Sequence, residues 1–134
     1  MTRMVTKDDL QSYIDRLDTN GFTSTEVESD LWVLKITDGA EVVINYAPPV
    51  VILRVRVMEA PADDGKRLAL FQHLLELNAR DMVYGSYGIE GSHVVLTDTL
   101  ELEHLDSTRF QASFDSITLA LASHMGVLAA HGGK

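Results

Sequence analysis

The sequence predicts a single α+β domain in which helices pack with an antiparallel sheet, in the order α-β-β-β-α-β-β-α. Three observations predict it. Apolar residues recur with helical spacing at both ends and in the middle of the chain. The segments between them are short aliphatic runs separated by turn signals. The 134 residues suit one domain over 1–134, and no linker divides them.

Composition argues against several classes of function. With a net charge of −9, the chain would repel a phosphate backbone, so we expect no nucleic-acid partner. No window approaches 18 uninterrupted apolar residues, and the N-terminus lacks the apolar core of a secretory signal. There is no cysteine to form a disulfide or a thiolate ligand. We therefore expect a cytoplasmic protein that does not bind membranes.

The first helix is predicted to begin at Thr6 and to stop at Asn20-Gly21. Thr6 can cap it, and Asp9 three residues later completes a capping box with Asp in place of Glu. One apolar stripe follows, made by Leu10, Tyr13, Ile14 and Leu17. We expect one face of this helix to be buried and the opposite face to be exposed to solvent.

Three strands are expected next, over Leu31 to Ile36, Glu41 to Tyr46 and Val50 to Met58. Asp38-Gly39 predicts a hairpin between the first two, because a type I′ turn needs positive φ at both central residues. Two prolines then separate the second strand from the third. In the third strand one face carries Val51, Leu53, Val55 and Val57, and the other carries Ile52, Arg54, Arg56 and Met58. That alternation is typical of a sheet with one face buried in the core and one face partly exposed to solvent.

The second helix, expected over Lys66 to Arg80 with Asp63 or Asp64 as its cap, is apolar on more than one side. Its apolar residues are Leu68, Ala69, Leu70, Phe71, Leu74, Leu75, Leu77 and Ala79. Such a helix must pack on its own sheet and against something else. We expect a homodimer whose interface includes Leu70, Phe71, Leu74 and Leu77; a further layer of the same chain is the alternative.

The glycine-marked stretch after this helix predicts a strand over Met82 to Ile89, a turn at Glu90-Gly91 and a second strand through 94–96. Asp106 should cap the last helix. The buried stripe of that helix is predicted to contain Phe110, Phe114, Ile117 and Leu121, widened by Ala112, Leu119, Ala122, Met125 and Leu128. Residues 131–134 should fray and be disordered.

Three segments carry a family resemblance: LLELNARDMVYGSYGI, VVLTDTLEL and HLDSTRF. Over roughly residues 66–128 the chain resembles the YbjN family. The shared pattern is a leucine-rich helix that ends in Leu-Asn, then a glycine-marked strand pair, then Leu-Asp at the start of the last helix. More distantly, the chain is similar to type III secretion chaperones of the CesT kind. The resemblance implies a compact, commonly dimeric α+β domain. The resemblance to the chaperones implies an exposed apolar surface that holds a client protein. The resemblance to the YbjN family implies a regulatory, sensory-transduction-like role.

The residues offer no catalytic, cofactor or metal site. Gly85-Ser86-Tyr87-Gly88 matches the GxxG string of KH domains, but it lies in a strand of an acidic protein rather than between helices. Ser86 lacks the glycine two residues earlier that a nucleophile elbow needs. The pairs His73–Glu76 and Glu101–His104 supply two ligands each, whereas zinc and di-iron centres need three or four. We expect no enzyme.

Protein binding has positive support from aromatic, Met and aliphatic residues on predicted strands, some of which must face away from the helices. The candidate partner-binding residues are Trp32, Tyr46, Ile52, Met58, Tyr84 and Tyr87. The same residues would alternatively complete the core or a dimer interface. The sequence thus predicts a chaperone-like module that holds or regulates a protein partner. A regulatory module that responds to a small ligand through its dimer is the alternative.

Overall fold

The computed structural model describes residues 4–19, 21–36 and 40–131. Its elements are α1 (Lys7–Thr19), β1 (Thr23–Glu28), β2 (Leu31–Lys35), β3 (Glu41–Ala47), β4 (Val50–Glu59), α2 (Asp64–Arg80), β5 (Ser86–Glu90), β6 (His93–Glu101) and α3 (Ser107–Ala129). The predicted α+β class is confirmed. The structure adds one strand, β1, between the first helix and the strand predicted at Leu31.

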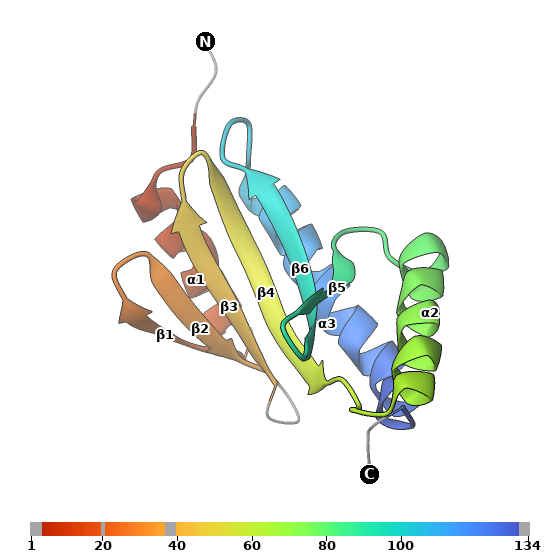
Figure 1. The fold of residues 1–134 in the computed structure, drawn as a ribbon. Helices are drawn as coiled ribbons and strands as arrows, with labels where there is room; N and C mark the ends of the chain where they lie inside the picture. Colours follow the sequence, from red (N-terminus) through yellow and green to blue (C-terminus); the bar gives the residue numbers. More distant parts are fainter. Residues whose placement is uncertain (1–3, 20, 37–39, 132–134) are drawn as a thin grey trace.

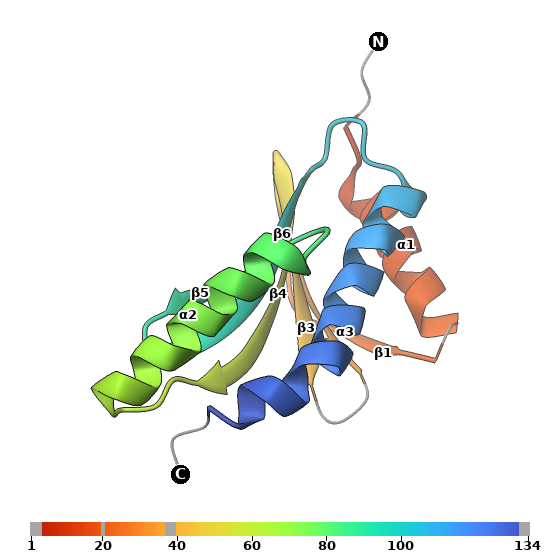
Figure 2. The same ribbon diagram turned by 90° about the vertical axis from the view of Figure 1, so that its right-hand side faces the viewer.

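The six strands form one antiparallel sheet in the order β1-β2-β3-β4-β6-β5. α1 and α3 lie behind the sheet in Figure 1 and cover the same face of it. Figure 2 shows α2 beyond the β5 edge, next to β5. The other face of the sheet carries no helix among the described residues, so it is called the uncovered face below.

Alternation along the strands decides which side chains form the core. Trp32, Ile44 and Leu53 are neighbours in the sheet register, and all three are buried under the helices. Phe110 and Phe114 of α3 are buried against them as predicted, together with Ile117 and Leu121. In β4 the register shifts between Arg56 and Met58, and this bulge brings Met58 against the core instead of the uncovered face.

The predicted helix starts are confirmed. The Thr6 amide donates to Asp9 Oδ2 at 3.0 Å and the Asp9 amide donates to Thr6 Oγ1 at 3.2 Å, so the capping box is reciprocal. Asp63 rather than Asp64 caps α2 by accepting from the Lys66 amide, and Asp106 caps α3 in the same way. The predicted Asp38-Gly39 hairpin and residues 132–134 lie outside the described residues.

α3 is long and apolar enough to cross a membrane by length and composition alone, a test that core helices of soluble domains also pass. Here one side of the helix is buried beneath the sheet and in contact with α1. Its Phe110 ring lies 5.8 Å from Tyr13, and its Phe114 ring lies 5.1 Å from Phe22 at the end of the α1–β1 turn. These contacts account for the apolar character of that side.

Candidate partner-binding surface

The strand residues predicted to meet a partner lie mostly inside the fold. Trp32 is 1% exposed, and its Nε1 donates to Gln11 Oε1 at 2.9 Å. Tyr46 and Met58 are half-buried and pack against the core. Ile52 alone lies on the uncovered face of the sheet, where it is half-buried opposite Asn45 and Thr99.

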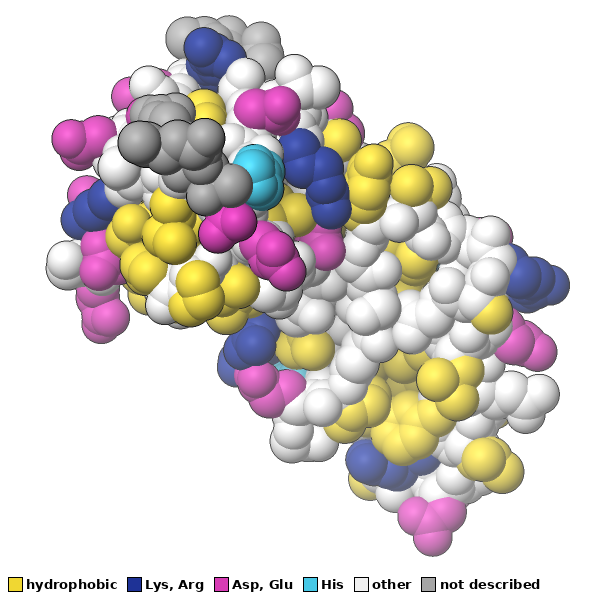
Figure 3. Space-filling view, turned by 90° about the horizontal axis from the view of Figure 1, so that it is seen from above, with side chains coloured by type: hydrophobic (Ala, Val, Ile, Leu, Met, Phe, Trp, Pro, Cys, Tyr) yellow, Lys and Arg dark blue, Asp and Glu magenta, His cyan; other side chains and the backbone are white. Residues whose placement is uncertain are grey.

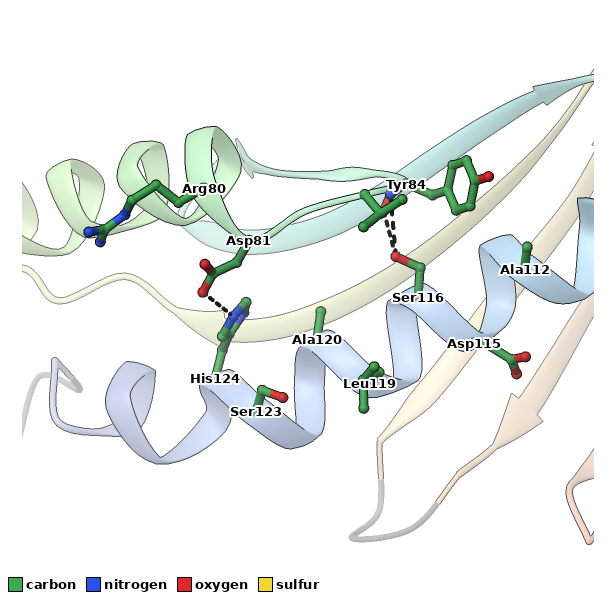
Figure 4. A pocket seen from close by; sticks show the side chains of 11 residues that line it. Arg80, Asp81, Tyr84, Ala112, Asp115, Ser116, Leu119, Ala120, Ser123 and His124 are labelled. Carbon is green, nitrogen blue, oxygen red and sulfur yellow. Dashed lines mark hydrogen bonds and ion pairs between the residues drawn. The ribbon is translucent and has the colours of Figure 1, made fainter.

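Tyr87 belongs to a polar cluster that joins β5 to both neighbouring helices. The phenol lies 2.8 Å from Nδ1 of the buried His124, and His124 Nε2 lies 3.2 Å from Asp81 Oδ2 (Figure 4). The tautomer of His124 that carries its proton on Nε2 can accept from the phenol at Nδ1 and donate to the carboxylate from Nε2, so one tautomer satisfies both contacts. Burial, and secondarily the charge of Asp81, raises the pKa of Tyr87 to about 12.

Asn78 covers the free edge of β5. Its Oδ1 accepts from the Tyr87 amide at 2.7 Å, and its Nδ2 donates to the Tyr87 carbonyl at 3.0 Å. A neighbouring strand would use the same two backbone groups. The Asn78 side chain therefore takes the place of a neighbouring strand at Tyr87, and it protects this part of the β5 edge from pairing with another chain.

Tyr84 lies in the turn that precedes β5, because the strand begins at Ser86 rather than at Met82 as predicted. The Arg109 guanidinium lies 3.9 Å from the centre of the Tyr84 ring. Ser116 Oγ accepts from the Tyr84 amide and donates to the Tyr84 carbonyl. The ring and the backbone of Tyr84 are therefore both held against α3.

The predicted dimer residues on α2 face inward. Leu70, Leu74 and Leu77 are buried in the core of their own chain. Phe71 is half-buried with the Arg67 guanidinium 5.2 Å from its ring centre. The outer face of α2 instead exposes two other leucines, Leu68 at 69% and Leu75 at 68%.

Most of the exposed large apolar side chains belong to α2, the following turn and α3. Of nine large apolar residues that are exposed in the described structure, six lie there: Leu68, Leu75, Val83, Leu119, Met125 and Val127. Leu119, Ala122 and Met125 were expected to widen the buried face of α3, and all three are exposed. Leu119 is 69% exposed because it lies two residues from Ile117, which places it on the opposite side of the helix.

Two hollows lie on either side of Leu119. The first, about 600 Å³, lies between α3 on one side and the end of α2 with the turn that follows it on the other; Arg80, Asp81, Val83 and Tyr84 line it from that second side (Figure 4). The second, about 570 Å³, lies between α3 and Phe22, Ile36 and Ala40. We call the first the polar hollow and the second the apolar hollow. The outward residues of α3 beside them form the α3 ridge, namely Asp115, Leu119, Ala122 and Met125.

Apolar surface is not continuous on the face of the molecule that Figure 3 shows. Seen from above in Figure 3, it forms separate patches divided by polar and charged side chains. On the uncovered face of the sheet, Val43 and Val95 line a hollow of about 490 Å³ together with charged residues. Arg54 Nη1 and Glu90 Oε2 pair across it at 2.7 Å. This face is therefore more polar than the α3 ridge.

The histidines do not build a metal centre among the described residues, where no three His, Asp or Glu side chains converge. His73 Nδ1 lies 3.1 Å from His131 Nε2, which joins α2 to the end of α3. His131 was expected to fray with the last three residues, and in this structure it contacts His73. Glu76 and Glu101 are exposed.

Comparison with known proteins gives a family and a fold. The family model described as CesT_Tir_1 matches residues 3–132. No curated protein matches the sequence. One similar structure is a chain of the heterodimeric ExoU–SpcU complex from the type III secretion system of Pseudomonas aeruginosa, with a TM-score of 0.65 and 14% identity over 90% of this chain and 94% of that chain.

Two further structures have TM-scores of 0.64. One is a chain of the HopA1–SchA chaperone–effector complex, 11% identical over 90% of this chain and 92% of that chain. The other is YbjN from E. coli, described as a candidate transcription regulator, 16% identical over 92% of this chain and 94% of that chain. The family match and the shared fold confirm the resemblance that the sequence segments carried.

Proposed function

Because the chain belongs to the CesT_Tir_1 family, we propose that it is a non-enzymatic, chaperone-like domain that holds or regulates a protein partner. The concentration of exposed apolar side chains on α2, the following turn and α3 carries this proposal. Apolar side chains grouped beside hollows are typical of surfaces that bind polypeptide. Two structures of similar fold are complexes, and one is described as a chaperone with its effector.

The α3 ridge is the surface we assign to the partner. Leu119 is exposed between the polar and apolar hollows, so a partner side chain can contact it from either direction. The sheet offers a second possible contact at β1, which pairs with β2 alone. Asn78 pairs with both edge groups of Tyr87 on β5. Asp18 accepts from the Ser24 amide of β1 at 2.8 Å, so an extended partner segment would add main-chain hydrogen bonds at the β1 residues beyond Ser24.

We further propose that the protein is a cytoplasmic homodimer formed through α2. Leu68 and Leu75 are seven residues apart and lie on the same exposed side of α2. Burying two leucines per copy contributes roughly 3–6 kcal/mol for each subunit by transfer free energy. Multi-angle light scattering should give a dimer mass for the wild type and a monomer mass for Leu75→Glu. A wild type that remains monomeric at high micromolar concentration would contradict this assignment.

An aggregation assay tests the holding function. Citrate synthase heated with increasing amounts of the protein should scatter less light as the molar ratio approaches one. Leu119→Asp should weaken this effect, because it places a charge in the centre of the α3 ridge. Ile89→Asp is the matched control, since Ile89 is 42% exposed on β5 and lines neither of the hollows beside Leu119. Unchanged scattering at every ratio of the wild type would refute the proposal.

The alternative is a regulatory module that responds to a small ligand through its dimer. The polar hollow favours it, because a volume of about 600 Å³ lies in the range of small-molecule sites and His124 and Ser116 line it. A metabolite library screened by thermal unfolding distinguishes the two functions. A compound that raises the melting temperature, together with no protection of citrate synthase, would favour the ligand-sensing function.

A further inference from the structure

We propose that the partner segment seated on the α3 ridge is a cationic amphipathic helix. Its apolar residues would contact Leu119 and enter the apolar hollow, and a lysine or arginine would pair with Asp115. This inference rests on the proposed function and names the chemical class of the client. Three features of the ridge carry it: its charge, its shape and the direction of its polar groups.

Asp115 supplies the charge. Among the described residues that line the apolar hollow, it is the only charged one, and it also lines the polar hollow. Its Oδ1 accepts from Gln111 Nε2 at 2.8 Å, which orients the carboxylate, and it forms no ion pair within the described structure. The whole chain has a net charge of −9, so its long-range field also attracts a cationic partner.

The nearest basic residue of the polar hollow does not neutralise this carboxylate. Figure 4 shows Arg80 at the α2 end of the hollow, with its guanidinium pointing away from the cavity, while Asp115 lies at the opposite end. Asp81, on the same side as Arg80, contacts His124 instead. A positive side chain of the partner would therefore meet Asp115 without competition from Arg80. The basic residue that shares a neighbouring hollow with Asp115 is Arg16 of α1, and the described structure contains no ion pair between the two.

The shape of the surface favours a helix. Asp115, Leu119 and Ala122 recur at i, i+4 and i+7, so they form one row along α3 with a hollow on each side. A helix packs by placing its own rows of side chains into such grooves. The apolar hollow contains Phe22, Ile36 and Met125, which are contacts for aliphatic side chains. An amphipathic helix presents apolar anchors at i, i+3, i+4 and i+7 and leaves its other face for charge.

A pair of synthetic peptides tests the charge requirement. Both are fluorescein-labelled helices with leucine at the anchor positions; one carries lysine at every polar position and the other carries glutamate. Fluorescence anisotropy should show that the lysine peptide binds at least tenfold more tightly. Asp115→Asn should weaken binding of the lysine peptide about two- to fivefold, as expected for an exposed ion pair, and should reduce its salt dependence. Leu119→Ser should weaken binding about fivefold or more.

Glu41→Gln is the matched control, because Glu41 is an exposed acid on the uncovered face of the sheet and its loss changes the net charge by the same amount. Equal effects of Asp115→Asn and Glu41→Gln would overturn the inference by attributing the attraction to overall charge. Equal affinity for both peptides would overturn the cationic class while leaving the proposed function intact. Failure of both peptides to bind would also overturn the inference, and the citrate synthase assay then decides whether the proposed function fails with it.

A second copy of the chain could cover the α3 ridge instead of a partner, and light scattering tests this alternative. Light scattering on Leu119→Asp should give the same mass as the wild type, because the proposed dimer contact lies on α2. A change from dimer to monomer in this variant would show that a second copy covers the α3 ridge, and it would overturn the inference.

Discussion

Asn78→Ala should destabilise the fold by removing the cover from the β5 edge. The substitution deletes two hydrogen bonds, of 2.7 and 3.0 Å, to the backbone of Tyr87. Each contributes about 0.5–1.5 kcal/mol, which gives about 1–3 kcal/mol together. Alanine is the better helix former by about 0.5 kcal/mol, which offsets part of the loss. The net decrease in the free energy of unfolding should be about 0.5–2.5 kcal/mol.

Urea unfolding followed by circular dichroism measures this change, and hydrogen exchange locates it. The Tyr87 amide should exchange faster in Asn78→Ala, because solvent reaches a donor that the side chain now covers. Asn45→Ala is the matched control, since Asn45 is half-buried on the uncovered face and makes no side-chain hydrogen bond in the described structure. A loss no larger than that of Asn45→Ala, or an unchanged exchange rate at Tyr87, would refute the role of Asn78.

Two further predictions concern the same region. Gly85 has φ +83°, and an added Cβ would lie 2.8 Å from the Thr97 carbonyl oxygen. Gly85→Ala should therefore lower the free energy of unfolding in urea by about 2–4 kcal/mol. Gly91 is the matched control: it has φ +62° with open space around it, so Gly91→Ala should lower the free energy of unfolding by about 1 kcal/mol. Equal losses would show that the close approach is unimportant. The pKa of Tyr87 is raised from 10.0 to about 12, so the folded state holds the phenol proton more tightly and stability should fall as the pH rises from about 10 to about 12. Tyr87→Phe should remove that part of the alkaline loss, and an unchanged pH profile would contradict the assignment.

Local signals in the sequence predicted local structure well. Thr6, Asp63 and Asp106 cap the helices because each interaction closes within three residues, and nothing distant has to form first. β1 was not predicted. Thr23–Glu28 is polar and mostly exposed, so it lacks the alternation that marks a half-buried strand. It is a strand because β2 pairs with it, and the residues of β1 alone do not indicate that pairing.

The candidate surface was harder to predict for a different reason. Periodicity shows which residues share a face, but it does not show what covers that face. Leu70, Leu74 and Leu77 share one side of α2, and the core of their own chain covers them. Leu119 falls off the stripe that contains Phe110, Phe114 and Ile117, and this offset was the available signal that it is exposed.

Two side chains that pair with backbone groups fix the segment that connects α2 to β5. Asn78 occupies both edge groups of Tyr87, and Ser116 pairs with both the amide and the carbonyl of Tyr84. Residues 84–87 are thereby fixed between α2 and α3, with the rings of Tyr84 and Tyr87 held by Arg109 and His124. These two aromatic side chains, which were expected to contact a partner, instead contact other residues of their own chain. Exposed apolar side chains remain on the outer sides of α2 and α3, where we propose that a second copy and the partner bind.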